Sequence, residues 1–199
     1  MIVIGVIGPI AAGKSVVIDE FRRLGAAAIC ADEVSRELLV PGSDLLERVI
    51  IAFGESYRGE VGGLDRAKLG ALVFADDDAR VRLEKIVHPA MVNYIARRIA
   101  EFRGEEAAAV VVEAANLVEM GALPLVDVTV TVSAPEELRL QRLMARDGLS
   151  REQAARRMAL HECLRIEQHR TNFRIDSSGD ESATRREVQL LWRELVQFQ

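Results

Sequence analysis

Residues 5–21 read "GVIGPIAAGKSVVIDEF" and place a glycine-rich turn between an apolar run and an amphipathic segment. The residues before the turn are mostly β-branched, which predicts a buried strand over residues 2–7. Val17, Phe21 and Leu24 follow at helical spacing, and Gly25 ends that pattern. The stretch therefore predicts a strand, a glycine loop and a helix in direct succession, as in α/β proteins.

The loop from Gly8 to Ser15 matches the P-loop pattern, in which four residues separate a glycine from Gly-Lys-Ser. Backbone N–H groups and the positive end of a helix hold phosphates in such a loop. We predict that Lys14 bridges the β and γ oxygens of ATP as a catalytic group, and that Ser15 ligates Mg²⁺. The predicted nucleotide-binding residues of the loop are Gly8, Ala11, Ala12, Gly13, Lys14, Ser15 and Val16.

Pro9 and Ala11 occupy positions that such loops often fill with glycine. Pro9 lacks an N–H group, but the donors nearest the phosphates come later, from about Ala12 to Ser15. Glycine can take a positive φ at little cost, whereas alanine at position 11 would pay on the order of 1 kcal/mol for it. The loop should therefore still bind phosphates, with a slightly changed backbone conformation.

Four further apolar runs predict strands at residues 27–30, 108–113, 127–132 and 172–176, separated by helical patterns. The middle runs do not alternate with polar residues, as expected for strands buried on both faces. We predict an α/β fold with a five-stranded parallel sheet and helices on both faces. The 199 residues suggest one P-loop kinase domain, 1–199. Its expected parts are a core of 1–31, 105–135 and 171–199, a helical acceptor-binding region of 32–104 and a lid of 136–170.

Helix boundaries can be placed from their caps. Asp65 and Asp76 are expected to cap two helices of the inserted region, and a final helix is expected over about 182–197. Ser150 and Gln153 have the spacing of a capping box. The capping box at Ser150 divides the expected lid into two helices joined by a short turn.

Composition excludes several classes of protein. The net charge of −5 provides no general basic field for nucleic acid. Cys30 and Cys163 are isolated, so neither a disulfide framework nor a zinc site is indicated. No apolar run approaches the roughly 20 residues of a spanning helix, and the first residues lack a basic segment. We expect a cytoplasmic protein with a small-molecule substrate, without nucleic-acid or membrane partners, as a monomer or weak homo-oligomer.

Two acidic residues follow predicted strands, at the edge of the sheet where α/β proteins bind ligands. Asp32 comes after the second strand and is a candidate general base, although Asp is also a common helix N-cap. Glu113 ends the third strand and is either a metal-site acid or a polar strand end. Arg139, Arg142 and Arg146 share one face of a helix, which fits phosphate-covering arginines or a solvated face.

Blocks along the whole chain resemble the dephospho-coenzyme A kinase family as a divergent member. They are "GVIGPIAAGKSVVIDEFRRLGAAAICADEVSRELLVPG" at 5–42, "FG" at 53–54, "GGLDRAKLGALVF" at 62–74, "LEKIVHPAM" at 83–91 and "QRLMARDGLSREQAARRM" at 141–158. The resemblance implies transfer of the γ-phosphoryl group of ATP to the ribose 3′-hydroxyl of dephospho-coenzyme A. This reaction is the last step of coenzyme A synthesis.

The resemblance also implies roles for individual residues. Asp32 matches the second aspartate of the family's IDAD block and is expected to be catalytic and to contact the acceptor. Arg142 would be catalytic and, with Arg146 and Ser177, would bind the nucleotide. The implied acceptor-binding residues are Asp32, Arg66 in "LDR", Glu119 and His88 in "HP". His88 precedes Pro89 at an expected helix start, where a structural role is an equal alternative.

The chain departs from the family pattern at several positions. Cys30 replaces the first aspartate of IDAD, and we expect a small buried residue there. Ala115, Asn116, His161 and Ser177 also differ. An alternative is therefore a paralogue that binds ATP but phosphorylates another acceptor or acts as a regulator. The loop "GPIAAGKS" also resembles that of tRNA dimethylallyltransferases, although the acidic balance argues against a tRNA partner.

Overall fold

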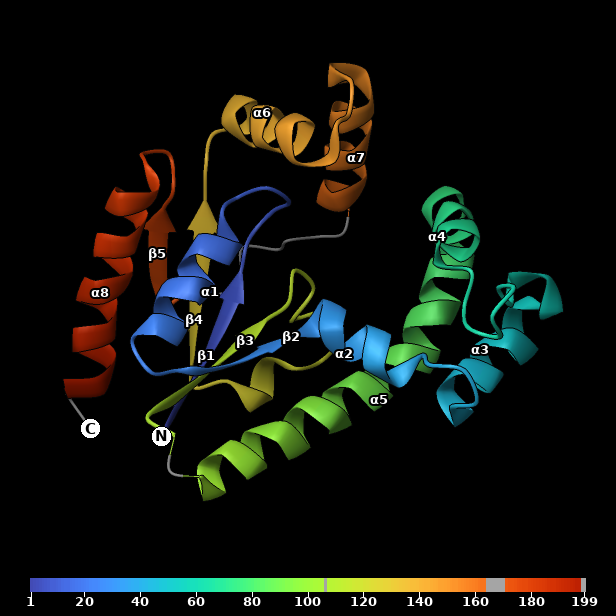
Figure 1. The fold of residues 1–199 in the computed structure, drawn as a ribbon, viewed down its shortest axis with the longest axis horizontal. Helices are drawn as coiled ribbons and strands as arrows, with labels where there is room; N and C mark the ends of the chain where they lie inside the picture. Colours follow the sequence, from blue (N-terminus) through green and yellow to red (C-terminus); the bar gives the residue numbers. More distant parts are fainter. Residues whose placement is uncertain (106, 164–170, 198–199) are drawn as a thin grey trace. The chain divides into compact units, whose positions relative to one another are not determined.

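The computed structural model describes residues 1–105, 107–163 and 171–197. Contacts divide the chain into two compact units, Met1–Ile29 with Ile99–Gln199, and Cys30–Arg98. Strands and helices alternate along the chain (Figure 1). The elements are β1 (Ile2–Ile7), α1 (Lys14–Arg23), β2 (Ala27–Cys30), α2 (Ala31–Leu38), α3 (Asp44–Phe53), η1 (Glu55–Tyr57), α4 (Arg66–Ala75), α5 (Asp77–Gly104), β3 (Ala109–Glu113), η2 (Leu123–Leu125), β4 (Val128–Ser133), α6 (Glu136–Asp147), α7 (Arg151–Cys163), β5 (Phe173–Asp176) and α8 (Glu181–Gln197).

The strands form one parallel sheet in the order β2-β3-β1-β4-β5. β1 lies at the centre, with Ile4 aligned to Val111 of β3 and to Val128 of β4. All five strands lie within one residue of their predicted positions, so the predicted five-stranded parallel sheet is confirmed. The central place of β1 puts the glycine loop at the carboxyl edge of the sheet, between neighbours on both sides.

One face of the sheet packs against α1 and α8, which lie side by side (Figure 1). Val17 and Phe21 of α1 are fully buried, and the Phe21 ring lies 6.2 Å from the ring of Trp192 in α8. On the other face, a Cβ atom at Gly5 would meet Leu117 at 2.7 Å, so the segment after β3 packs tightly on β1. Burial on both faces explains why β1 and β3 read as continuous apolar runs, whereas β5 has exposed polar residues between its apolar ones.

The unit Cys30–Arg98 contains helices with the predicted caps. The Asp65 carboxylate accepts a hydrogen bond from the N–H of Lys68, and the Asp76 carboxylate accepts from the N–H groups of Asp78 and Ala79. One expectation is wrong, because Pro89 lies inside α5 and does not begin a helix. Buried Val87 and Met91 on either side of the proline hold the helix together through packing.

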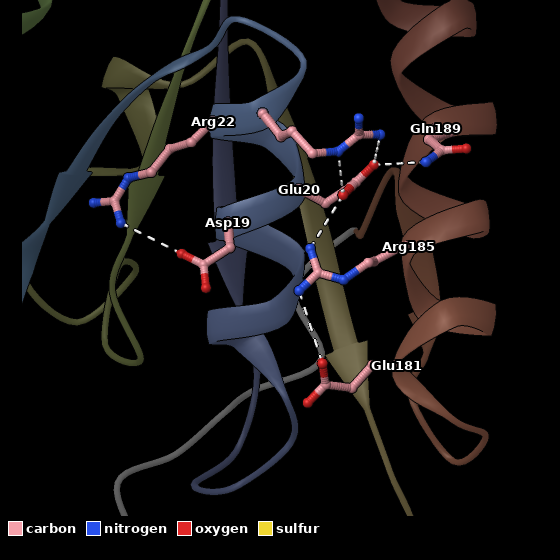
Figure 2. Close-up of polar contacts among 7 residues, drawn as sticks. Asp19, Glu20, Arg22, Glu181, Arg185 and Gln189 are labelled. Atoms are coloured by element: carbon pink, nitrogen blue, oxygen red, sulfur yellow. Dashed lines mark hydrogen bonds and ion pairs between the residues drawn. The ribbon is translucent and has the colours of Figure 1, made fainter.

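A buried carboxylate that the sequence did not reveal joins α1 to α8. The Glu20 side chain is fully buried and accepts hydrogen bonds from Arg23, at 2.9 and 2.5 Å, from Arg185 at 3.1 Å and from Gln189 at 2.6 Å. Figure 2 shows that Arg185 and Gln189 reach Glu20 from α8. The hydrogen bond with Arg23, aided by those with Gln189 and Arg185, lowers the pKa of Glu20 to about 2.

This cluster predicts an acid-dependent part of the stability. The folded pKa of about 2 lies below the ordinary value of 4.5, so Glu20 stabilises the fold above pH 4.5 and loses this effect as the pH falls toward 2. We expect Glu20→Gln to lower the free energy of unfolding by about 2 kcal/mol at pH 7. The difference from wild type should shrink between pH 4.5 and 2 in urea titrations. A difference that stays constant over this range would contradict the assignment.

No helix among the described residues is long and apolar enough to cross a membrane.

Candidate active site

The phosphate loop has the backbone conformation that its glycines and Ala11 require. Ala11 adopts φ 58°, the only positive value among non-glycine residues in the described part of the chain, so alanine here takes the conformation that glycine adopts at lower cost. Gly13 has φ 90°, and a Cβ atom there would lie 2.8 Å from the Ser177 Oγ atom. Ala12 is fully buried, and its N–H donates to the Pro9 carbonyl at 3.2 Å. The loop is therefore a fixed turn.

Gly8 stands where the loop passes close to β4. Its φ is 152°, and a Cβ atom would lie 2.4 Å from the carbonyl oxygen of Val132. The Val132 carbonyl is part of the backbone of β4, and the position of the Cβ atom is set by the backbone of Gly8. Neither atom can therefore move aside without shifting the sheet. Only glycine fits this position.

Lys14 is the first residue of α1, and its side chain folds back over the loop. The ammonium group donates to the carbonyl oxygens of Gly8 at 3.1 Å and Pro9 at 3.3 Å. These two bonds hold a positive charge beside the loop, at the positive end of a helix dipole. The ammonium group and the helix dipole together favour the binding of an anion that carries several negative charges.

A cavity of about 400 Å³ lies beside the loop, within the unit that contains the sheet. Seven of the predicted nucleotide-binding residues line it together: Ala11, Gly13, Ser15, Val16, Arg142, Arg146 and Ser177. The remaining lining residues are Gly179, Asp180, Glu181 and Thr184, from the beginning of α8. The cavity therefore lies between the first turns of two helices and under the arginines of α6.

Arg142 of α6 connects the arginine-bearing helix to the loop. Its guanidinium donates to the Ser177 hydroxyl at 3.0 Å and to the Ser177 carbonyl at 2.6 Å. The same hydroxyl donates to the Ala12 carbonyl at 2.5 Å, and Ser177 is buried. Ser177, which replaces an asparagine of the family pattern, thus joins β5, the loop and α6.

Arg146 also lines the cavity but has an acidic partner. It donates to both carboxylate oxygens of Asp147, at 2.7 and 3.0 Å, and Arg157 of α7 donates to the same carboxylate at 2.7 Å. The bonds from Arg146 lower the pKa of Asp147 below its usual value. Arg139 is buried in the same helix and does not line the cavity. The predicted arginine face therefore divides into two cavity residues and one buried residue.

The capping box of the second lid helix is confirmed. The Gln153 side chain accepts from the Ser150 N–H at 2.9 Å, and the Ser150 hydroxyl accepts from the Gln153 N–H at 3.2 Å. Arg151 pairs with Glu137 of α6, so the two lid helices are also linked by charge. The His161 side chain and residues 164–170 of the predicted lid lie outside the described residues.

The residues predicted to hold Mg²⁺ belong to two elements, Ser15 to α1 and Glu113 to β3. Ser15 is exposed and lines the cavity, and Glu113 is aligned in the sheet with Val6, two residues before Gly8. The described residues contain no group of three or more His, Cys, Asp or Glu side chains that could hold a metal ion. Because Mg²⁺ in kinase sites uses one or two protein ligands besides phosphates and water, Ser15 and Glu113 fit it.

Other predicted site residues lie in the unit Cys30–Arg98. Asp32 is exposed in the first turn of α2, whose N-cap is Cys30, so the N-cap alternative for Asp32 is wrong. Arg66 begins α4 and donates to the Ser35 carbonyl at 3.1 Å. Burial and then the charge of Arg36 lower the pKa of Arg66, while Asp32 acts in the opposite direction. The fold thus brings Asp32 and Arg66 within electrostatic reach of each other.

His88, Glu119 and Cys30 have less defined settings. His88 lies inside α5, where burial lowers its pKa and the charge of Glu84 opposes the shift. Glu119 is exposed in the turn after β3. Cys30 is half-buried at the end of β2, so the expectation of a buried residue is wrong. Its place at the N-cap of α2, at the edge of the sheet, leaves it partly open to solvent.

Sequence reasoning missed the wall of the cavity formed by Gly179, Asp180, Glu181 and Thr184. The signal was present, because Gly179 and Asp180 follow the last strand and precede a helix. Asp180 is the residue that caps α8, and its carboxylate accepts from the N–H of Ala183 at 2.7 Å. A strand end followed by a capped helix is the same arrangement that places the phosphate loop at this edge.

Comparison with known proteins identifies the relatives of this fold and site. The family model described as dephospho-CoA kinase matches residues 2–180. The dephospho-CoA kinase of Syntrophotalea carbinolica is 41% identical over 98% of this chain and 93% of its own length. That of Geobacter sulfurreducens is 39% identical over 96% of this chain and 98% of its own.

A solved structure agrees with these relatives. The dephospho-CoA kinase from Campylobacter jejuni superimposes with a TM-score of 0.70 at 27% identity, covering 98% of this chain and 97% of its own. The predicted family, the P-loop kinase fold and the phosphotransferase class are confirmed. The chain belongs to the dephospho-CoA kinase family, whose members are ATP-dependent enzymes of the last step of coenzyme A biosynthesis.

Proposed function

We propose that this chain transfers the γ-phosphoryl group of ATP to the ribose 3′-hydroxyl of dephospho-coenzyme A. The observation that carries the proposal is the cavity at the phosphate loop, in a chain whose family match extends over residues 2–180. In this reaction the 3′-oxygen forms a bond to the γ-phosphorus, the bond to the β,γ-bridging oxygen breaks, and ADP leaves. The family match also supports the expected cytoplasmic location.

The nucleotide phosphates bind at the loop. The N–H groups near Gly13 and Ser15 face the β-phosphate, and the Lys14 ammonium leaves the carbonyls of Gly8 and Pro9 to contact the β and γ oxygens. Arg142 and Arg146 line the same cavity and neutralise the charge that develops on the transferred group. Ser15 and Glu113 would hold Mg²⁺, which would supply positive charge to neutralise the phosphates.

The acceptor side is provided by the helical region 32–104. Asp32 orients the 3′-hydroxyl and accepts its proton, and its exposed carboxylate is suited to this task. Arg66 contacts an acceptor phosphate, because a guanidinium binds phosphate through two parallel hydrogen bonds. His88 and Glu119 complete the acceptor contacts. The half-buried thiol of Cys30 takes the place of a carboxylate without supplying its charge.

The reaction is tested directly with purified protein, Mg²⁺, ATP and dephospho-coenzyme A. Coenzyme A and ADP should appear in equal amounts, measured by chromatography. Binding of ATP without coenzyme A formation, by protein with an intact fold, would favour the paralogue or regulator alternative. An acceptor panel that includes nucleosides then identifies another substrate.

Replacement of the proposed base should reduce the chemical step. We expect Asp32→Asn to lower kcat about 10²- to 10⁴-fold, because the amide cannot accept the hydroxyl proton, while the affinity for ATP stays unchanged. Glu33→Gln is the matched control, since Glu33 is the next exposed acid in the first turn of α2. Equal activities of the two variants would rule out Asp32 as the base.

A further inference from the structure

The cavity has two walls that come from different helices. Gly13, Ser15 and Val16 lie at the beginning of α1, and Asp180, Glu181 and Thr184 lie at the beginning of α8. The width of the cavity between these walls depends on how the two helices are held together. The apolar contact between Phe21 and Trp192 helps to hold α1 and α8 together. Apolar contacts, however, allow two helices to slide past each other more readily than directed hydrogen bonds do.

Glu20 supplies directed bonds between these helices. It lies six residues after Lys14, about 9 Å along α1 at the usual helical rise. Its carboxylate accepts from Arg185 and Gln189 of α8, and Arg185 lies one turn after Glu181 of the cavity wall. A fully buried carboxylate with partners on two helices cannot move without losing charge-assisted bonds.

We infer that Glu20 is a positioning residue for the nucleotide site, which acts through Arg185 and Gln189 by holding the first turn of α8 against that of α1. The inference rests on the proposed use of the cavity for ATP. It assigns a role in nucleotide affinity to a side chain that does not line the cavity. Figure 2 shows Arg185 and Gln189 of α8 beside the Glu20 carboxylate, to which Arg23 of α1 also donates.

The cluster itself offers a matched pair of variants. Arg23 donates twice to Glu20 from within α1, whereas Arg185 donates from α8. Arg23→Ala and Arg185→Ala each remove a guanidinium from the same carboxylate, but only Arg185→Ala removes a bond between the helices. Gln189→Met serves as a second interhelical variant, because Arg185 also pairs with Glu181 at 3.7 Å. Glu181→Ala tests the effect of that other pair.

The experiment measures KM for ATP, kcat and ADP affinity by calorimetry, at a temperature where every variant is folded. We expect Arg185→Ala and Gln189→Met to raise KM for ATP and the ADP dissociation constant by about three- to tenfold, with kcat within about twofold of wild type. Arg23→Ala should lower thermal stability while leaving both nucleotide constants unchanged. The KM for dephospho-coenzyme A should stay constant in all variants.

Three results would overturn the inference. The first is wild-type nucleotide constants in Arg185→Ala and Gln189→Met. The second is an equal weakening of nucleotide binding in Arg23→Ala, which would indicate general destabilisation. The third is a weakening in Arg185→Ala that also occurs in Glu181→Ala but not in Gln189→Met. Failure of the proposed function is distinguishable, because wild-type protein would then form no coenzyme A.

Discussion

Replacing Lys14 by methionine should lower kcat about 10³-fold, a loss within the range of about 10²- to 10⁴-fold expected for Asp32→Asn. The ammonium group is held beside the loop by the Gly8 and Pro9 carbonyls, at the amino end of α1. Methionine keeps most of the length of the side chain and its apolar contacts but removes the charge. Initial rates of coenzyme A formation at saturating ATP measure the effect.

Lys85→Met is the control for the loss of a lysine charge. Lys85 is exposed on α5, so its replacement should leave kcat within about twofold of wild type. Thermal unfolding of both variants shows whether the fold is retained. A folded Lys14→Met protein with more than a tenth of wild-type activity would refute the role of this lysine in phosphoryl transfer.

The largest effect on stability is expected for Gly8→Ala. The new Cβ atom would lie 2.4 Å from the Val132 carbonyl oxygen, at a φ of 152° that disfavours any side chain. Because the Val132 carbonyl belongs to the backbone of β4 and cannot move aside without shifting the sheet, we expect a loss of about 4 kcal/mol in the free energy of unfolding. Chemical denaturation measures the loss, and ATP binding should fall with it because the loop begins at this residue.

The variant Gly25→Ala distinguishes the cost of a positive φ from the cost of the close contact between position 8 and Val132. Gly25 also has a positive φ, 101°, but a Cβ atom there would have no atom within 4 Å. This variant should lose only about 1–2 kcal/mol, the cost of the left-handed conformation for alanine. If the two variants lose equal stability, the contact with β4 is not what selects glycine at position 8.

Much of the fold follows from local sequence. All five strands lie within one residue of their predicted positions, and β1 and β3 are recognised as continuous apolar runs because both of their faces are buried. Asp65 and Asp76 were correctly predicted as caps because an N-cap contacts N–H groups only two or three residues away. The cost of a positive φ at Ala11 could be recognised from the loop pattern, but that Ala11 adopts it is known only from the structure.

Other expectations failed where packing overrules local preference. Pro89 was expected to begin a helix, yet α5 continues through it between buried neighbours. Asp32 was a possible N-cap, but the helix begins one residue earlier, at Ala31. Cys30 is half-buried because it ends an edge strand at the margin of the sheet. An edge position follows from the order of the strands in the sheet, which residues close together in the chain do not reveal.

By itself, the sequence determined that this chain binds nucleotide phosphates on a parallel α/β sheet, because the loop and strands are encoded by residues close together in the chain. Only the tertiary structure decided the walls of the cavity and the bonds that hold them. Glu20 meets Arg185 and Gln189 across more than 160 residues, and Ser177 meets Ala12 across the same separation. Such pairs depend on strand order and helix packing, which bring distant residues together after the sheet has formed.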